Sequence, residues 1–190
     1  YLKYNNRVGT ISSANASYRL ITNVGASASK GIETYIEFNP GRAFSNTVYT
    51  DIILFSSYAY TDARYSADHK DANTKDKKVE NAPQDIFRGG ISYGYKKILI
   101  TAQLSFVGAS FSDANNTIAA SANGNTGLIP SYSITDLTAS YKFSKIVQLR
   151  AGINNLLDKR YFTRRAAGYP GPGALPADGR SFFFTLGAKI

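Results

Sequence analysis

The feature that most constrains this chain is a regular alternation of apolar and polar side chains in its last segments. Within residues 180–190, every second residue from Phe182 to Ile190 is apolar and lies on one face of an extended strand, and residues 147–154 and 136–143 repeat this division. Successive side chains of a β-strand point to opposite faces, so a period of two predicts half-buried strands. The apolar members of the three segments are Phe182, Phe184, Leu186, Ala188, Ile190, Val147, Leu149, Ala151, Ile153, Leu137, Ala139, Tyr141 and Phe143.

Five further segments upstream are predicted to be strands. Residues 98–107 and 87–95 alternate in the same way with more interruptions, whereas residues 48–65, 19–38 and 2–11 show blurred alternation. The chain is rich in Tyr, Phe, Gly, Ser, Thr and Asn, a composition that favours strands joined by turns. We therefore expect an all-β, antiparallel chain of eight strands that forms one incomplete domain.

The connections between these segments are either very short or long. Lys96-Lys97 and Ser144-Lys145 are tight turns, and Pro40-Gly41 lies in a turn of intermediate length. The long polar connections are residues 66–82, 115–127 and 164–179. Short turns on one rim and long loops on the other are typical of an outer-membrane β-barrel, whose closed sheet pairs its backbone polar groups within hydrocarbon.

Aromatic residues near the strand ends fit the same interpretation, because membrane barrels carry aromatic girdles at both interfaces. The alternative is that these rings fill the core of a soluble β-sandwich, but a sandwich seldom segregates its loop lengths so regularly. The residues concerned are Tyr58, Tyr60, Tyr93, Tyr95, Tyr141 and Phe143.

Residues that could carry out catalysis or hold a metal are few. His69 is the only histidine and there is no cysteine, so the sequence suggests neither a histidine-based triad nor a thiolate site. Glu33 and Glu37 share a strand face about 13 Å apart, which is too far for a catalytic carboxylate pair. One polar stretch lacks the glycine and terminal glutamate of a calcium loop. Its members are Asp71, Asn73 and Asp76. We expect no enzyme activity, no bound metal and no cofactor.

Positive charge is concentrated near the last long loop, where the stretch from Lys159 to Arg180 holds five basic residues and one acid, Asp178. The basic residues are Lys159, Arg160, Arg164, Arg165 and Arg180. In a barrel, these groups could form structural pairs, meet lipopolysaccharide phosphates at the rim or hydrogen-bond an anionic ligand in the vestibule. Arg164 and Arg165 are the candidate substrate-binding residues. The barrel pattern argues against nucleic-acid binding.

Four motifs resemble one known family. Residues 152–161 read G-I-N-N-L-L-D-K-R-Y and resemble the penultimate-strand motif of TonB-dependent receptors. Residues 23–33, N-V-G-A-S-A-S-K-G-I-E, resemble a strand-opening segment there, and Asn81-Ala82-Pro83 resembles the N-x-P that starts the next strand. Residues 162–180, with F-T-R-R, Y-P-G-P-G and D-G-R-S, are most similar to receptors of the ferric-citrate type.

The resemblance covers essentially all of residues 1–190 and implies the last eight strands of a 22-stranded transmembrane barrel. It also implies an N-terminal plug domain and a TonB-contacting box outside this sequence. We expect a fragment or processed part of a longer protein, since the chain begins at Tyr1 and has no methionine. Family members usually end on an aromatic residue, so Ile190 is a departure that concerns barrel assembly.

The resemblance and the arginine-rich loop predict a bacterial outer-membrane receptor for active import of a ferric chelate such as ferric dicitrate. The implied partners are that chelate, TonB, and outer-membrane lipid with lipopolysaccharide, but not nucleic acid. A second hypothesis is a self-contained eight-stranded barrel with a structural or adhesive role. A third is an outer-membrane enzyme or a soluble carbohydrate-binding sandwich. The upstream coding sequence separates the first two, because a plug domain supports import and an adjacent signal peptide supports the small barrel.

Overall fold

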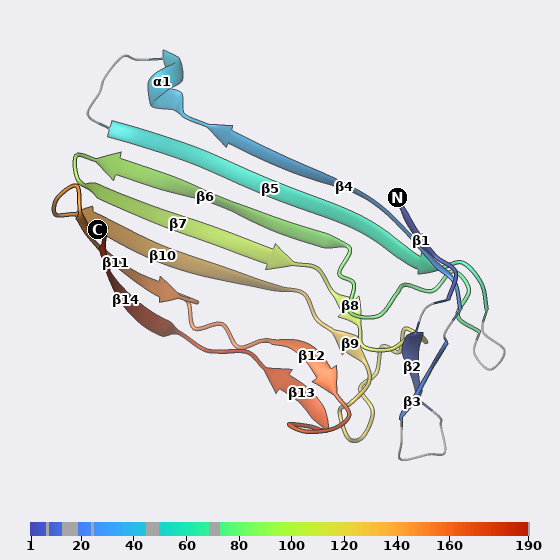
Figure 1. Cartoon of the computed structure of the whole chain (residues 1–190). Coiled ribbons are helices and arrows are strands. Elements are labelled where there is room, and N and C mark those ends of the chain that lie inside the picture. The colour runs from blue at the N-terminus through green and yellow to red at the C-terminus, as the bar shows by residue number, and fades with distance from the viewer. Residues whose placement is uncertain (7, 13–18, 24, 45–49, 69–72, 190) are drawn as a thin grey trace.

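Eight strands of the computed structural model form one antiparallel sheet in the order β1-β4-β5-β6-β7-β10-β11-β14, with β1 and β14 at its edges (Figure 1). The structure describes residues 1–6, 8–12, 19–23, 25–44, 50–68 and 73–189. The sheet consists of β1 (Leu2–Tyr4), β4 (Ser27–Phe38), β5 (Thr50–Tyr65), β6 (Asp85–Tyr95), β7 (Ile98–Val107), β10 (Tyr132–Lys142), β11 (Val147–Asn154) and β14 (Ser181–Ala188).

Three two-stranded hairpins lie beyond one end of this sheet, and a short helix lies beyond the other (Figure 1). They are β2 (Val8–Ser12) with β3 (Arg19–Asn23), β8 (Ser110–Phe111) with β9 (Leu128–Ile129), β12 (Phe162–Ala166) with β13 (Gly173–Pro176), and α1 (Pro40–Phe44). In the part of the chain that the structure describes, no helix has the length and apolar character needed to cross a membrane.

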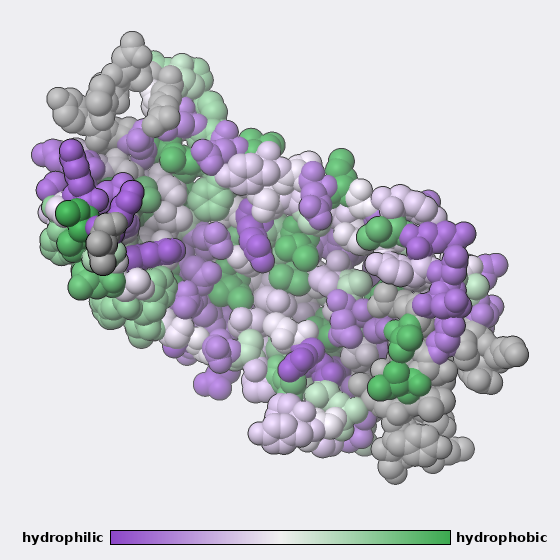
Figure 2. All heavy atoms as spheres, in the orientation of Figure 1, coloured by the Kyte–Doolittle hydropathy of each residue, from purple (hydrophilic) through white to green (hydrophobic). Residues whose placement is uncertain are grey.

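The apolar side chains of neighbouring strands share one face of the sheet, as the alternation predicts. Directly opposed residues lie on the same face, and the register places Leu149 of β11 opposite both Tyr141 and Leu186. Hydrophobic residues lie at the molecular surface among hydrophilic ones (Figure 2), and on the apolar face Phe184 is 79% and Leu186 71% exposed. An exposed apolar face of this extent is suited to hydrocarbon.

The opposite face carries polar side chains and aromatic rings that cover glycines. Ser92 Oγ lies 2.8 Å from Thr101 Oγ1, which links β6 to β7 across this face. The ring of Phe55 lies over Gly90, its directly opposed partner, so closely that a Cβ there would approach the ring to 2.5 Å. Such aromatic–glycine pairs help to fix strand register.

One rim of the sheet has short connections. Lys96 adopts a φ of 53° in the turn from β6 to β7, and the Ser144 side chain accepts hydrogen bonds from the backbone N–H groups of Ile146 and Val147 in the turn from β10 to β11. The two-residue turn at Lys96-Lys97 is therefore confirmed, whereas the turn expected at Ser144-Lys145 is longer and spans residues 143–146. The connection around Pro40 contains α1, which the sequence did not reveal. We call this edge the short-turn rim, and in an outer-membrane barrel it is the periplasmic one.

The other rim carries the long connections, and the small buried core of the chain lies beneath them. Tyr65, at the end of β5, is fully buried and donates its hydroxyl to Glu80. It packs with Ala63, Val79 and Ala114, which come from the strand end and two different loops. We call this edge the long-loop rim.

Two of the predicted strands are divided. The expected strand at residues 2–11 ends at Tyr4, and its second half becomes β2, which pairs with β3 in a hairpin outside the sheet. The expected strand at residues 19–38 is broken before β4, where Gly25 has a φ of +97° and donates its N–H to Asn23 Oδ1. A positive φ removes a residue from the strand conformation, so the pairing partner changes there.

Candidate functional site

The long-loop rim is built from three loops that hydrogen-bond to one another. They are the first long loop (residues 66–84), the second (residues 108–131) and the third (residues 155–180). The side chain of Asn116 in the second loop makes two hydrogen bonds with the backbone of Lys78 in the first. Asn116 Oδ1 accepts from the Lys78 N–H, and Asn116 Nδ2 donates to the Lys78 carbonyl, each at 2.7 Å. The Asn81 N–H also donates to the Phe111 carbonyl at 2.7 Å. The first two loops therefore form one unit.

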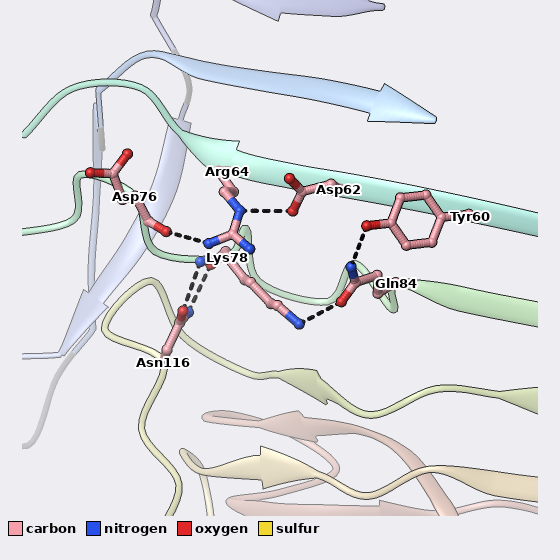
Figure 3. Close-up of polar contacts among 7 residues, drawn as sticks. All are labelled: Tyr60, Asp62, Arg64, Asp76, Lys78, Gln84 and Asn116. Atoms are coloured by element: carbon pink, nitrogen blue, oxygen red, sulfur yellow. Dashed lines mark hydrogen bonds and ion pairs between the residues drawn. The ribbon is translucent and has the colours of Figure 1, made fainter. Parts of the chain in front are cut away.

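Side chains of β5 fix the first loop to the sheet (Figure 3). Arg64 Nε lies 2.8 Å from Asp62 Oδ1, and Arg64 Nη1 donates to the Asp76 carbonyl at 2.9 Å. A second chain of bonds runs from Lys78 Nζ to Gln84 Oε1 and from Gln84 Nε2 to the Tyr60 hydroxyl, each 2.8 Å long. The cations Arg64 and Lys78 thus have structural partners.

Asn155 organises the start of the third loop. It is 4% exposed and adopts a φ of 51°, a left-handed conformation that asparagine tolerates better than most residues. Its Oδ1 accepts from the Lys159 N–H at 2.8 Å, and its Nδ2 donates to the Lys159 carbonyl at 2.9 Å. Its own N–H donates to Asp136 Oδ1 at 2.8 Å. This side chain therefore closes the turn after β11.

Asp158 binds the end of the third loop, where the chain returns to the sheet. It also has a φ of 51°, and its Oδ1 accepts from the Arg180 N–H at 2.9 Å, just before β14 begins. The N-N-L-L-D run is thus explained as a turn that joins the two ends of the third loop. From sequence this run was recognised as part of a family motif but not as such a turn, because the partners of Asn155 and Asp158 lie up to 23 residues away.

An aromatic pair connects the third loop to the sheet. The rings of Tyr132 in β10 and Tyr161 stack with centroids 4.5 Å apart. Burial raises the pKa of the Tyr161 hydroxyl, and Tyr132, Asp136 and Asp178 add to the shift. The hydroxyl is therefore neutral at physiological pH, as an uncharged contact between loop and strand requires.

Arg165 joins the third loop to the second. Its Nη1 donates to the Gly124 carbonyl at 2.9 Å, while Nε and Nη2 donate to the Leu128 carbonyl at 3.3 and 3.1 Å. The guanidinium also lies 4.9 Å from the ring centroid of Phe162. Arg165 is half-buried and occupied with these neighbours, which hold β12 against β9.

Arg164 is placed differently although it is the adjacent residue. It lies opposite Leu175 in the β12–β13 hairpin, whereas Arg165 lies opposite Ala174. Its side chain is exposed and borders a shallow hollow formed with the proline-rich segment 170–176. Within the described residues, the guanidinium of Arg164 takes part in no hydrogen bond or ion pair that the structure shows. Its donors are available, and the two arginines do not converge on one point.

The remaining predicted candidates fall into two groups. His69 and Asp71 lie outside the described residues. Asp76 takes part in the loop through its backbone, and Glu37 Oε2 accepts from the Tyr35 hydroxyl at 2.7 Å. The described ranges contain no group of three or more His, Cys, Asp or Glu side chains placed to hold a metal ion.

The apolar outer face, the polar opposite face and the unequal rims define a segment of an outer-membrane β-barrel. The chain belongs to the family of TonB dependent receptor-like β-barrels, whose family model matches residues 1–156. Members of this family are outer-membrane transport receptors and not enzymes, so the predicted family, fold class, location and lack of enzyme activity are confirmed.

One curated relative is a probable TonB-dependent siderophore receptor, PiuA, of Acinetobacter baumannii. It is 43% identical over 65 residues, which are 34% of this chain and 8% of the relative. The solved structure of the PiuA receptor from the same species matches with a TM-score of 0.64 at 25% identity, covering 88% of this chain and 22% of that one.

Two further solved structures share the fold. The unliganded ferric citrate transporter FecA gives a TM-score of 0.76 at 23% identity, covering 87% of this chain and 24% of that one. The copper transporter OprC gives a TM-score of 0.70 at 20% identity, covering 98% of this chain and 26% of that one. The chain therefore spans about a quarter of the length of these solved receptors.

Proposed function

We propose that residues 1–190 are the C-terminal part of the barrel of a receptor that imports an anionic ferric chelate across the outer membrane. Membership of the TonB-dependent family supports active import energised through TonB by a part of the protein outside this sequence. The self-contained eight-stranded barrel is not favoured, because the solved receptors that match are about four times as long as the matched segment. The coding sequence upstream of Tyr1 tests this assignment, and a signal peptide directly before Tyr1 would contradict it.

The chemistry of the long-loop rim supports a ferric chelate with carboxylate groups as the substrate. The single observation that carries this is the exposed guanidinium of Arg164, which faces a hollow at the rim with its donors available. A guanidinium binds carboxylate through a planar fork of N–H groups. One matching structure is described as a ferric citrate transporter and another as a siderophore receptor, which agrees with such a substrate.

Arg164 and Arg165 would divide the work of ligand recognition. Arg164 contacts the chelate directly. Arg165 has five N–H donors and uses three of them to hydrogen-bond the second loop, which holds β12 in place. Its two remaining donors can bind the chelate. The exposed Lys159 and Arg160 lie at the same rim, where phosphates of lipopolysaccharide would be their partners.

Binding of radiolabelled ferric dicitrate to the full-length receptor in energy-depleted cells tests the assignment of Arg164. We expect Arg164→Ala to weaken binding about 10- to 100-fold, as loss of a charge-assisted hydrogen bond predicts. Arg160→Ala is the matched control, because it removes a neighbouring exposed charge without touching the hollow. Unchanged binding in the double variant Arg164→Ala with Arg165→Ala would refute both site residues.

A further inference from the structure

The polar face of the sheet carries a second group of cations near the short-turn rim, far from the arginines of the third loop. Arg150 of β11 lies opposite Ser140 of β10, and Lys142 lies opposite Gln148. Arg150 and Lys142 are therefore diagonal neighbours on one face, within reach of a single small ligand. Both side chains are exposed.

Three more lysines extend this group around the turns. Lys97, Lys142, Lys145 and Lys189 line one hollow of about 790 Å³, whose other lining residues carry no charge. An adjoining hollow of about 500 Å³ shares Lys97 and Lys142 with the first. Figure 2 shows strongly hydrophilic residues gathered at this end of the molecule. We call Lys97, Lys142, Lys145, Arg150 and Lys189 the basic strip.

The cations of the basic strip have no carboxylate partner among the described residues. The one acid that lines either hollow is Asp51, which borders the second hollow and accepts a hydrogen bond from Asn39 Nδ2 at 3.2 Å. Lys97 Nζ donates to the Phe143 carbonyl at 3.1 Å, an uncharged partner. Charges of one sign that line a hollow attract ligands of the opposite sign.

Arg150 has an aromatic neighbour on the adjacent strand. Its guanidinium lies 5.7 Å from the ring centroid of Phe183 on β14. That ring in turn covers Gly152, where a Cβ would approach it to 2.4 Å. A guanidinium at this distance from an aromatic ring is attracted to it without an ion pair.

We propose that the basic strip is a transit site that binds the anionic chelate at the periplasmic end of the barrel interior. The proposal rests on the proposed function and extends it to a second location. Lysines act as flexible point charges and lack the rigid fork of arginine, so a strip with four of them suits brief contacts. A ligand in transit must be attracted strongly enough to enter and weakly enough to leave.

The test compares surface binding with uptake of radiolabelled ferric dicitrate by the full-length receptor. In Lys142→Gln with Arg150→Gln, we expect unchanged binding in energy-depleted cells and about tenfold slower uptake in energised cells. The charge-preserving pair Lys142→Arg with Arg150→Lys should restore most of the uptake. The matched control is Lys3→Gln with Lys30→Gln, which removes two charges from the opposite face.

Three outcomes would overturn the transit site: unchanged uptake in the glutamine variant, equal loss in the control, or equal loss in the charge-preserving pair. A fourth is loss of folded receptor in the glutamine variant, which would assign the strip to contact with an acidic part of the receptor itself. Failure of the proposed function is distinct, since the wild-type receptor would then bind no ferric dicitrate at the cell surface.

Discussion

At the scale of single residues, the third loop depends on side chains that accept and donate within one turn. Asn155 combines a left-handed backbone with two hydrogen bonds to Lys159, and Asp158 receives the returning chain at Arg180. The contacts of Asn155 are partly buried, and polar contacts of this kind specify a conformation because their loss leaves unpaired groups. The loop that carries Arg164, the proposed ligand contact, is therefore positioned by Asn155 and Asp158.

Replacement of Asn155 should destabilise the receptor. We expect Asn155→Ala to lower the free energy of unfolding by about 1–3 kcal/mol, because backbone groups of Lys159 lose their partners and alanine disfavours a positive φ. Asn155→Gly should be more stable than Asn155→Ala by the cost of the positive φ alone, because glycine adopts that φ but cannot replace the hydrogen bonds. Urea unfolding of the full-length receptor in liposomes measures both. The exposed Asn154, whose Nδ2 donates to Ser181 Oγ, provides the control Asn154→Ala, and equal effects at the two positions would contradict this account.

At the scale of elements, strand pairing relies on close contacts at particular glycines. A Cβ at Gly90 of β6 would lie 2.4 Å from the Ala102 carbonyl oxygen and 2.5 Å from the Phe55 ring. A backbone oxygen cannot move aside without disturbing the β6–β7 ladder. At Gly94, on the same strand and face, the nearest contact would be an ordinary 3.4 Å.

Gly90→Ala and Gly94→Ala therefore form a matched pair. We expect Gly90→Ala to cost about 1–3 kcal/mol of unfolding free energy, the range for overpacking. Gly94→Ala should change it by less than about 0.5 kcal/mol. The measurement is heat resistance of the folded barrel on electrophoresis together with urea unfolding. Equal stability of the two variants would show that the Phe55–Gly90 contact has no energetic role.

The sequence predicted the central strands well because their information is local. The alternation in residues 147–154 and 180–190 matches the apolar and polar faces of β11 and β14, and the turns at Lys96 and Ser144 lie as expected. The division at Gly25 and the hairpins within the loops were missed, since their pairing depends on distant segments. The same limit applies to the long-loop rim. Whether Arg164 is exposed and Arg165 bonded to the second loop depends on contacts between loops.

At the scale of the whole molecule, the chain is an open sheet with an apolar face, a polar face and two different rims. Figure 1 shows the long loops and hairpins at one end and the short turns at the other. This arrangement places Arg164 at the long-loop rim and the basic strip near the short-turn rim, which are the proposed entrance and exit for the ligand. Both proposed sites therefore require the polar face to line the barrel interior.

The most direct test of that requirement is lipid accessibility along β11. The chain has no native cysteine, so single cysteines at residues 147–154 of the full-length receptor, in an otherwise cysteine-free background, can carry spin labels in liposomes. We predict that collisions with a lipid-soluble relaxation agent alternate with period two, high at Val147, Leu149, Ala151 and Ile153 and low at the residues between them. Uniform accessibility, or the opposite phase, would contradict the assignment of the apolar face to the membrane.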